Sequence, residues 1–98
     1  MSSTILVSRS LESSAAAFSA LGDPLRLQIL DLLGDGKQCV CELRERIDVA
    51  PNLLSYHLKV LRDTGLVEAT RRGRWVDYRL ADAELDALRQ AIPSEHGR

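Results

Sequence analysis

Glycine and proline residues divide this chain of 98 residues into short segments, and this division limits the fold more than any other feature. Asp23 and Pro24 suit the N-cap and first turn of a helix, and Gly34 suits its C-terminal end. Pro51 suits the first turn of a further helix, which Gly65 ends. Segments of this length hold helices of a few turns, so a small, mainly helical domain is predicted.

Apolar residues recur at helical spacing within these segments, so each helix is predicted to bury one face. The helices are expected over residues 11–21, 24–33, 41–47, 51–62 and 82–92. After Gly65, apolar and polar side chains alternate on both sides of a turn at Arg72-Gly73, which predicts a β-hairpin. Its strands are expected over residues 66–70 and 75–80.

Four helices, a β-hairpin and a final helix form, in this order, a winged helix-turn-helix, a unit that reads DNA. The fold class is therefore predicted to be mainly α with a small β-hairpin (α+β, in the order ααααββα). The domain is expected to cover residues 11–92, between flexible tails at residues 1–10 and 93–98. Asp82 is the expected N-cap of the last helix, and Asp48 is the candidate cap of the fourth.

The net charge of −1 hides an uneven distribution of charge along the chain. Residues 51–80 carry six Arg and Lys against three Asp and Glu, whereas acidic residues are in excess in residues 1–50 and 81–98. The basic segment favours DNA as a partner, because local charge steers association with phosphates. No apolar run has membrane-spanning length and no secretion signal begins the sequence, so a cytoplasmic protein is expected.

The polar face of the fourth helix is the predicted DNA-reading surface. Asn52 and Lys59 carry groups that can bond to base edges in the major groove. Ser55 and Tyr56 are expected to reach phosphate oxygens, which position a protein without specifying sequence. The alternative is an amphipathic helix that is merely solvated on this side.

Three arginines, Arg71, Arg72 and Arg74, crowd the tip of the hairpin. Like charges repel there unless a polyanion neutralises them, so contact with phosphates or the minor groove is predicted. A solvated turn is the alternative for this tip. Trp75 and Tyr78 are predicted to pack within the hairpin and the core rather than to stack on bases.

Five motifs in this order resemble the arsenical-resistance repressor (ArsR/SmtB) family, over roughly residues 15–92. They are Gly22-Asp-Pro-Leu-Arg26, Cys39-Val-Cys-Glu-Leu43, Leu54-Ser-Tyr-His-Leu-Lys-Val-Leu61, Gly65-Leu66 and Gly73-Arg-Trp-Val-Asp-Tyr-Arg-Leu80. The resemblance implies a homodimeric repressor that binds an inverted-repeat operator in double-stranded DNA and leaves it when a metal ion binds. No cofactor is implied for DNA binding itself.

The resemblance also implies a dimer packed through the first and last helices. Both predicted helices carry apolar residues on one face, which agrees with that arrangement. The expected interface residues are Leu11, Ala15, Phe18, Leu85, Leu88 and Ile92.

The only two cysteines, Cys39 and Cys41, stand one residue apart at the start of the third helix. Successive helical residues turn by about 100°, so a pair within a regular helix could not hold one ion. If Cys39 lies in the loop and Cys41 in the first turn, a modest backbone rearrangement is expected to bring both sulfurs together. Because a disulfide between them would close a strained ring, free thiols in a reducing compartment are expected. These two sulfurs are the predicted metal ligands.

Soft thiolates select soft ions, and the resemblance to arsenite-type repressors implies As(III) or Sb(III) as the inducer. Arg44 stands where some arsenite sensors have a third cysteine, so a further ligand would have to come from elsewhere. Cadmium, thiol redox control and cysteines that only pack without any ligand remain open as alternatives. His57 lies beside the apolar face of the fourth helix and is predicted to be a buried structural residue and not a metal ligand.

Two other classes of site are disfavoured. The last helix offers acidic residues but no histidine, which argues against the zinc, cobalt or nickel sites of related sensors. An enzyme is also disfavoured, because the sequence has no Cys-x-x-Cys, no nucleotide-binding loop and no acid–base constellation.

Overall fold

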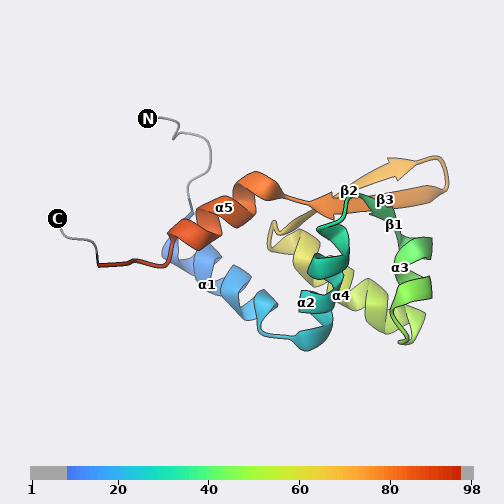
Figure 1. Cartoon of the computed structure of the whole chain (residues 1–98), viewed down its shortest axis with the longest axis horizontal. Helices are drawn as coiled ribbons and strands as arrows, with labels where there is room; N and C mark the ends of the chain where they lie inside the picture. The colour runs from blue at the N-terminus through green and yellow to red at the C-terminus, as the bar shows by residue number, and fades with distance from the viewer. Residues whose placement is uncertain (1–8, 96–98) are drawn as a thin grey trace.

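The computed structural model describes residues 9–95 and confirms the winged helix-turn-helix (Figure 1). The helices are α1 (Leu11–Leu21), α2 (Pro24–Leu33), α3 (Val40–Arg46), α4 (Pro51–Asp63) and α5 (Asp82–Gln90). The strands are β1 (Gln38–Cys39), β2 (Val67–Arg72) and β3 (Trp75–Leu80). In the described part of the chain, no helix is both long and apolar enough to span a membrane.

The predicted hairpin is part of a three-stranded antiparallel sheet in the order β1-β3-β2. The additional strand, β1, pairs Gln38 with Tyr78 and Cys39 with Asp77. A strand of two residues carries no periodicity of its own, which is why the alternation of side chains did not predict it. Its pairing places the first cysteine directly against the hairpin.

The hydrophobic core surrounds α4, which crosses the middle of the molecule (Figure 1). Its Leu54, Leu58 and Leu61 are almost completely buried, as the helical spacing predicted. Ile29 of α2 and Leu43 of α3 are buried against the same core. Helices α1 and α5 lie together at one end of the molecule, and α3 and the sheet lie at the other (Figure 1).

Two predicted helix boundaries are confirmed in detail. The Asp23 carboxylate accepts hydrogen bonds from the backbone N–H groups of Leu25 and Arg26, at 2.9 and 3.1 Å, and so caps α2. Gly65 follows α4 with φ of +80°, a left-handed conformation that glycine adopts without strain. The N–H of Leu66 then bonds to a carbonyl of the last turn, which ends the helix.

Two predicted caps are wrong. The N-cap of α5 is Ala81, and Asp82 lies within the first turn. There its negative charge interacts favourably with the helix dipole, but it makes no capping hydrogen bond. The N-cap of α4 is Ala50, which has no side-chain oxygen, and Asp48 does not replace it. Pro51 instead starts α4, because its fixed φ suits the first turn.

Arg9 and Ser10 were expected in the N-terminal tail but are bonded to the domain. Arg9 reaches Glu84 of α5 at 2.7 Å and the carbonyl of Thr64 at 3.3 Å. The hydroxyl of Ser10 accepts a bond from the N–H of Ser13 and caps α1. The remaining tail predictions for residues 1–8 and 96–98 lie outside the described residues.

Candidate DNA-binding and thiol sites

The predicted reading face of α4 is open to solvent. Asn52, Ser55, Tyr56 and Lys59 are all exposed, on the side of the helix opposite its buried leucines. The Lys59 ammonium lies 2.6 Å from the Asp63 carboxylate one turn later, and this hydrogen bond lowers the pKa of Asp63. Because such exposed pairs are weak, Lys59 can exchange this partner for a phosphate or a base.

His57 is buried in α4 and hydrogen-bonded, as predicted. Its Nδ1 lies 3.0 Å from a guanidinium nitrogen of Arg26 and accepts from it, since a guanidinium can only donate. Arg26 also donates to the carbonyl of Ala20 at 2.7 Å. The hydrogen bond from the Arg26 backbone lowers the pKa of Asp23, which lies 4.0 Å from the histidine ring. This network joins the turn between α1 and α2 to α4, the predicted recognition helix.

The hairpin of β2 and β3 is the wing of the fold. Its three arginines, Arg71, Arg72 and Arg74, are exposed but differ in their contacts. Arg72 donates two hydrogen bonds to the Asp77 carboxylate, at 2.9 and 3.1 Å. Arg71 makes a long bond of 3.4 Å to the carbonyl of Gly73, which takes φ of +65° at the tip. Arg74 has no ion pair within residues 9–95. Of the three, only Arg72 has its charge paired with an acid in the described part of the chain.

Asp77 is a site residue that the sequence did not single out. It lies in the central strand, only 5 % exposed, and accepts from Arg72 while Lys37 lies 3.9 Å away. The hydrogen bond from Arg72 lowers the pKa of Asp77, although burial acts in the opposite direction. It lies opposite Cys39 of β1 in the sheet.

Trp75 was predicted to pack in the hairpin, and it is 45 % exposed. It lies opposite Arg72 in the ladder, on the outward face of the sheet. Tyr78 lies on the other face and is buried, as predicted. The difference follows from the pleat, because side chains at odd and even positions of a strand point to opposite faces.

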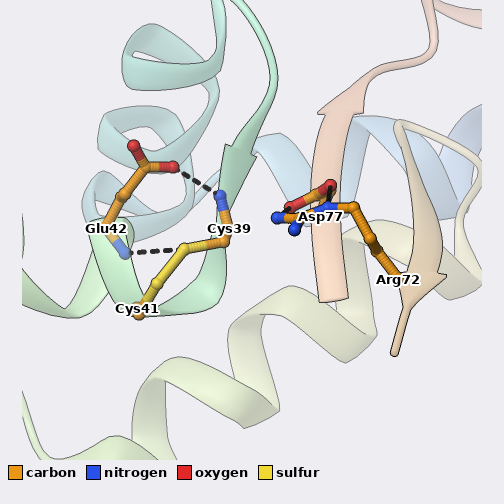
Figure 2. Close-up of a disulfide and its surroundings, with 5 residues drawn as sticks. All are labelled: Cys39, Cys41, Glu42, Arg72 and Asp77. Carbon is orange, nitrogen blue, oxygen red and sulfur yellow. Dashed lines mark hydrogen bonds and ion pairs between the residues drawn. A yellow bond between two sulfur atoms is a disulfide. The ribbon is translucent and has the colours of Figure 1, made fainter. Parts of the chain in front are cut away.

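The two cysteines form a disulfide, so the prediction of free thiols is wrong for this structure (Figure 2). The Cα atoms of Cys39 and Cys41 lie 5.3 Å apart, within the ordinary range for disulfides. Cys39 precedes α3 in an extended conformation, and Cys41 lies in the first turn of α3. This is the placement that was predicted to allow both sulfurs to meet.

Cys39 is also the N-cap of α3. Its sulfur accepts a bond from the N–H of Glu42 at 3.3 Å, and the Glu42 carboxylate accepts from the N–H of Cys39 at 2.7 Å (Figure 2). This reciprocal pair is a capping box in which sulfur takes the place of the usual hydroxyl. The sulfur therefore holds the helix that comes immediately before the recognition helix.

The surroundings of the cysteines determine what can reach them. Cys41, Arg44 and Glu45 border an open hollow of about 320 Å³, which is large enough to admit a small solute. Within residues 9–95 no cluster of three or more potential metal ligands is found. An ion at this pair would thus have two sulfur ligands from the described chain and would take its remaining ligands from solvent or another subunit.

Of the predicted interface residues, Leu11 and Ile92 are 87 % and 61 % exposed, and Ala15 is exposed as well. Phe18 and Leu85 are partly buried and line an apolar groove of about 430 Å³ between α1, α2 and α5. The groove is also bordered by Leu27 and Leu30 of α2, which the sequence did not indicate, and by Leu88. Leu88 is only 2 % exposed and packs in the core of its own chain.

Comparisons with known proteins agree with this architecture. Residues 23–69 match the model of a family described as bacterial regulatory protein, arsR family. The chain is 44 % identical over 72 residues to the arsenical resistance operon repressor of Bacillus subtilis (strain 168), which covers 72 % of this chain and 69 % of the relative. It is 41 % identical over 71 residues to a transcriptional repressor SmtB homolog of Synechocystis, covering 72 % of this chain and 54 % of the relative.

A solved structure extends the comparison to the whole fold. The homodimeric winged helix-turn-helix DNA-binding domain of a possible ArsR-family transcriptional regulator from Mycobacterium bovis superposes with a TM-score of 0.72 and 37 % identity. The match covers 81 % of this chain and 71 % of that one. The chain therefore belongs to the arsR family of bacterial regulatory proteins and is a transcriptional repressor of the ArsR/SmtB type, not an enzyme.

Proposed function

We propose that this repressor binds an inverted-repeat operator as a homodimer and is released when As(III) or Sb(III) binds the reduced thiolates of Cys39 and Cys41. The observation that carries the proposal is the contact of the two sulfurs at the start of α3. Two sulfurs that can bond to each other are close enough to share one small thiophilic ion. The name of the Bacillus subtilis relative, an arsenical resistance operon repressor, supports the same class of inducer.

The binding reaction begins with reduction of the disulfide by an external dithiol, which supplies two electrons and two protons. Each cysteine thiol then displaces one hydroxyl group of arsenous acid, As(OH)₃, and releases one water. Two As–S bonds result, and one hydroxyl stays on arsenic unless a further ligand replaces it. Soft sulfur ligands favour As(III) and Sb(III) over harder ions.

Release of DNA would follow from the position of the cap. Cys39 holds the first turn of α3 through its sulfur, and a short turn joins α3 to α4. An ion on that sulfur competes with its bond from the Glu42 N–H and shifts the start of α3. If the ion binds this shifted form more tightly than the DNA-bound form, it lowers the fraction of protein on the operator. The ratio of the two ion affinities sets the size of that decrease.

The DNA contacts would come from two elements. The exposed side chains of Asn52 and Lys59 are the candidates for base contacts in the major groove, and Ser55 and Tyr56 for phosphate contacts. The arginines of the wing would bind the flanking phosphates or the minor groove. In a symmetric dimer the two α4 helices would read half-sites separated by about one helical turn, roughly 34–36 Å.

Fluorescence anisotropy of a labelled fragment from upstream of the gene tests the proposal. The protein is titrated onto the fragment in reductant, and arsenite, antimonite, cadmium and zinc are then added separately. Arsenite or antimonite is expected to release the DNA at concentrations at which zinc does not. Cys39→Ser and Cys41→Ser are each expected to bind the fragment normally and to resist release, and normal release of either variant by arsenite would exclude the two-thiol site.

Thiol redox control is the second candidate, and the disulfide itself favours it. With hydrogen peroxide as the oxidant, one thiolate would take an oxygen to form a sulfenic acid and release hydroxide, which takes a proton from solvent to become water. The second thiol would then displace that oxygen as water and close the disulfide. Comparing operator affinity of dithiothreitol-reduced and peroxide-treated protein tests this candidate, since equal affinities would exclude it.

A further inference from the structure

We infer that Asp77 transmits the chemical state of the cysteine pair to the DNA-binding wing, by holding Arg72 only while β1 is paired against it (Figure 2). Asp77 is thus a positioning residue, since it acts on DNA through another side chain. The inference rests on the proposed function in one respect, namely that the state of the cysteines controls operator binding. It goes beyond that function in naming a route from the cysteines to the wing.

The first step is the geometry of Arg72. Asp77 accepts one bond from Nε and one from Nη2 of Arg72, so the guanidinium is fixed in one plane. Nη1 makes no hydrogen bond within residues 9–95. The Arg72 side chain is 61 % exposed while that of Asp77 is only 6 % exposed. A buried carboxylate therefore holds an exposed arginine in one orientation, which preorganises it for a phosphate.

The second step is the position of the cysteines on the same strand pair. Cys39 lies directly opposite Asp77 in the ladder, and β1 consists only of Gln38 and Cys39. The first residue of this short strand, Gln38, is anchored by its side-chain amide, which donates to the carbonyl of Leu32 at 2.7 Å. The second residue, Cys39, is held by the capping box with Glu42. A shift of Cys39 therefore displaces half of the strand that is paired beside Asp77.

The third step is electrostatic. Three cations lie around the Asp77 carboxylate, of which Arg72 is bonded to it and Lys37 lies 3.9 Å away beside β1. Arg79 acts on it from further along β3. An ion pair is strong where water is excluded and weak where it is not, so uncovering Asp77 weakens its hold on Arg72. Displacement of β1 would therefore free the wing arginine without any contact between the inducer and DNA.

The test is the isosteric variant Asp77→Asn in the full chain, kept in reductant. Its readout is the ratio of the operator Kd with arsenite to the Kd without it. Couplings between two sites commonly amount to about 5- to 150-fold. The ratio is expected to fall at least several-fold in Asp77→Asn, while the arsenite affinity measured by calorimetry stays that of the wild type. An unchanged ratio would show that Asp77 only stabilises the hairpin and would overturn the inference.

Glu68→Gln is the matched control. Glu68 is an exposed acid of the same hairpin, opposite Arg79, and it forms no ion pair within residues 9–95. The substitution removes the same charge from the same sheet and is expected to leave the ratio unchanged. If Asp77→Asn does not fold, Arg72→Lys replaces it, because lysine keeps the charge but cannot form the two-bond pair. Arg72→Lys is then expected to lower the ratio as well, and a wild-type ratio in that variant contradicts the relay.

Trp75, the only tryptophan of the chain, supplies a readout without DNA. It lies opposite Arg72 in the ladder, so its fluorescence is expected to change when arsenite binds the wild type. The change should be absent from Asp77→Asn at saturating arsenite. A change of the same size in both proteins would contradict the relay.

Failure of the proposed function can be separated from failure of the inference. If arsenite neither binds nor releases the wild type, the proposed inducer is wrong, and the dithiol and disulfide forms become the two states compared. Diamide oxidises the two thiols to the disulfide and is itself reduced to the hydrazine. The inference then expects these two forms to differ in operator affinity in the wild type but not in Asp77→Asn. Equal affinities of both wild-type forms would overturn it.

Discussion

The two ends of this molecule present opposite surfaces. At the helical end, the most exposed large hydrophobic side chains are Leu11 and Ile92, and Ile92 lines an apolar groove between α1, α2 and α5. At the sheet end, the exposed side chains of the wing are Arg71, Arg72 and Arg74, with Trp75 beside them. An apolar face is stabilised by another apolar face, and a basic one by a polyanion. We therefore expect a second copy of the chain at the helical end and DNA at the sheet end.

The recognition helix connects these two ends. Arg9, which is bonded to Glu84 of α5, also donates to the Thr64 carbonyl at the C-terminal end of α4. Arg26, at the start of α2, donates to His57 in the middle of α4. Two arginines from the helical end thus fix the helix whose exposed face is proposed to read DNA. Packing between subunits would therefore set the direction of α4 as well as the distance between half-sites.

The largest effect is expected from charging the helical end. In the double variant Leu11→Glu and Ile92→Glu, each subunit would bring two negative charges into the proposed interface, where those of the two copies repel. The core of each chain should stay intact. The 10.9 kDa chain is then expected to sediment as a single copy. Operator affinity should fall by about 10²- to 10⁴-fold, because one half-site no longer helps the other to bind. Analytical ultracentrifugation and anisotropy measure the two quantities.

Gln28→Glu is the control for this double variant. Gln28 is exposed on α2 and does not line the apolar groove, so its substitution adds negative charge at the same end without entering the interface. Dimer mass and operator affinity should stay those of the wild type. A double variant that remained dimeric would show that the second copy binds elsewhere.

Most of the helical end could be predicted because its signals are local. Asp23 and Pro24 lie next to the backbone groups that they cap or replace, and one helical period is enough to separate buried from exposed residues. Leu88 is the instructive exception. Its spacing placed it on the same face as Leu85, but it is buried by α1 and the core, and this depends on how the helices pack.

The sheet end was less predictable, because its decisive contacts join residues far apart in the sequence. The hairpin was predicted, and β3 begins at Trp75 and ends at Leu80 as expected. Strand β1 was missed because only pairing with β3 defines it. The burial of Asp77, a charged residue in the central strand, was not predicted. The disulfide was misjudged because the argument from ring strain did not consider an extended conformation at Cys39.

A smaller effect is expected at the wing. Arg74→Ala should weaken binding to all DNA sequences similarly and reduce the slope of log K against log salt by about 1, since one phosphate contact is lost. Arg72→Ala should weaken binding too but reduce the slope by less, because Asp77 already compensates the charge of Arg72 in the free protein. Anisotropy titrations at several salt concentrations measure both slopes.

Arg89→Ala extends the wing experiment to the other end of the molecule. Arg89 is an exposed arginine of α5 that pairs with Asp86 at 2.6 Å, so this variant removes the same charge far from the wing. Its salt slope should equal that of the wild type. Equal reductions for Arg74→Ala and Arg89→Ala would mean that net charge, and not contact at the wing, determines the slope.

The smallest expected effect compares two matched helix caps, Ser10 at the helical end and Cys39 at the sheet end. Each accepts a bond from the N–H three residues later, at 3.0 Å for the hydroxyl and 3.3 Å for the sulfur. Under reducing conditions, Cys39→Ala should lower the free energy of unfolding by about 1 kcal/mol, as loss of a cap does, and Ser10→Ala should do the same. Denaturant titration measures both losses.

Cys39→Ser separates the two roles of this cysteine. Serine is a good N-cap, so the unfolding free energy of the Cys39→Ser variant should equal or exceed that of the wild type. The variant should nevertheless lose the response to arsenite. Equal destabilisation by serine and alanine would mean that the sulfur contributes packing and not a cap. If serine retains stability but loses the response, the same sulfur holds α3 and receives the inducer, and competition between these two contacts is what makes the sheet end the switched end of the molecule.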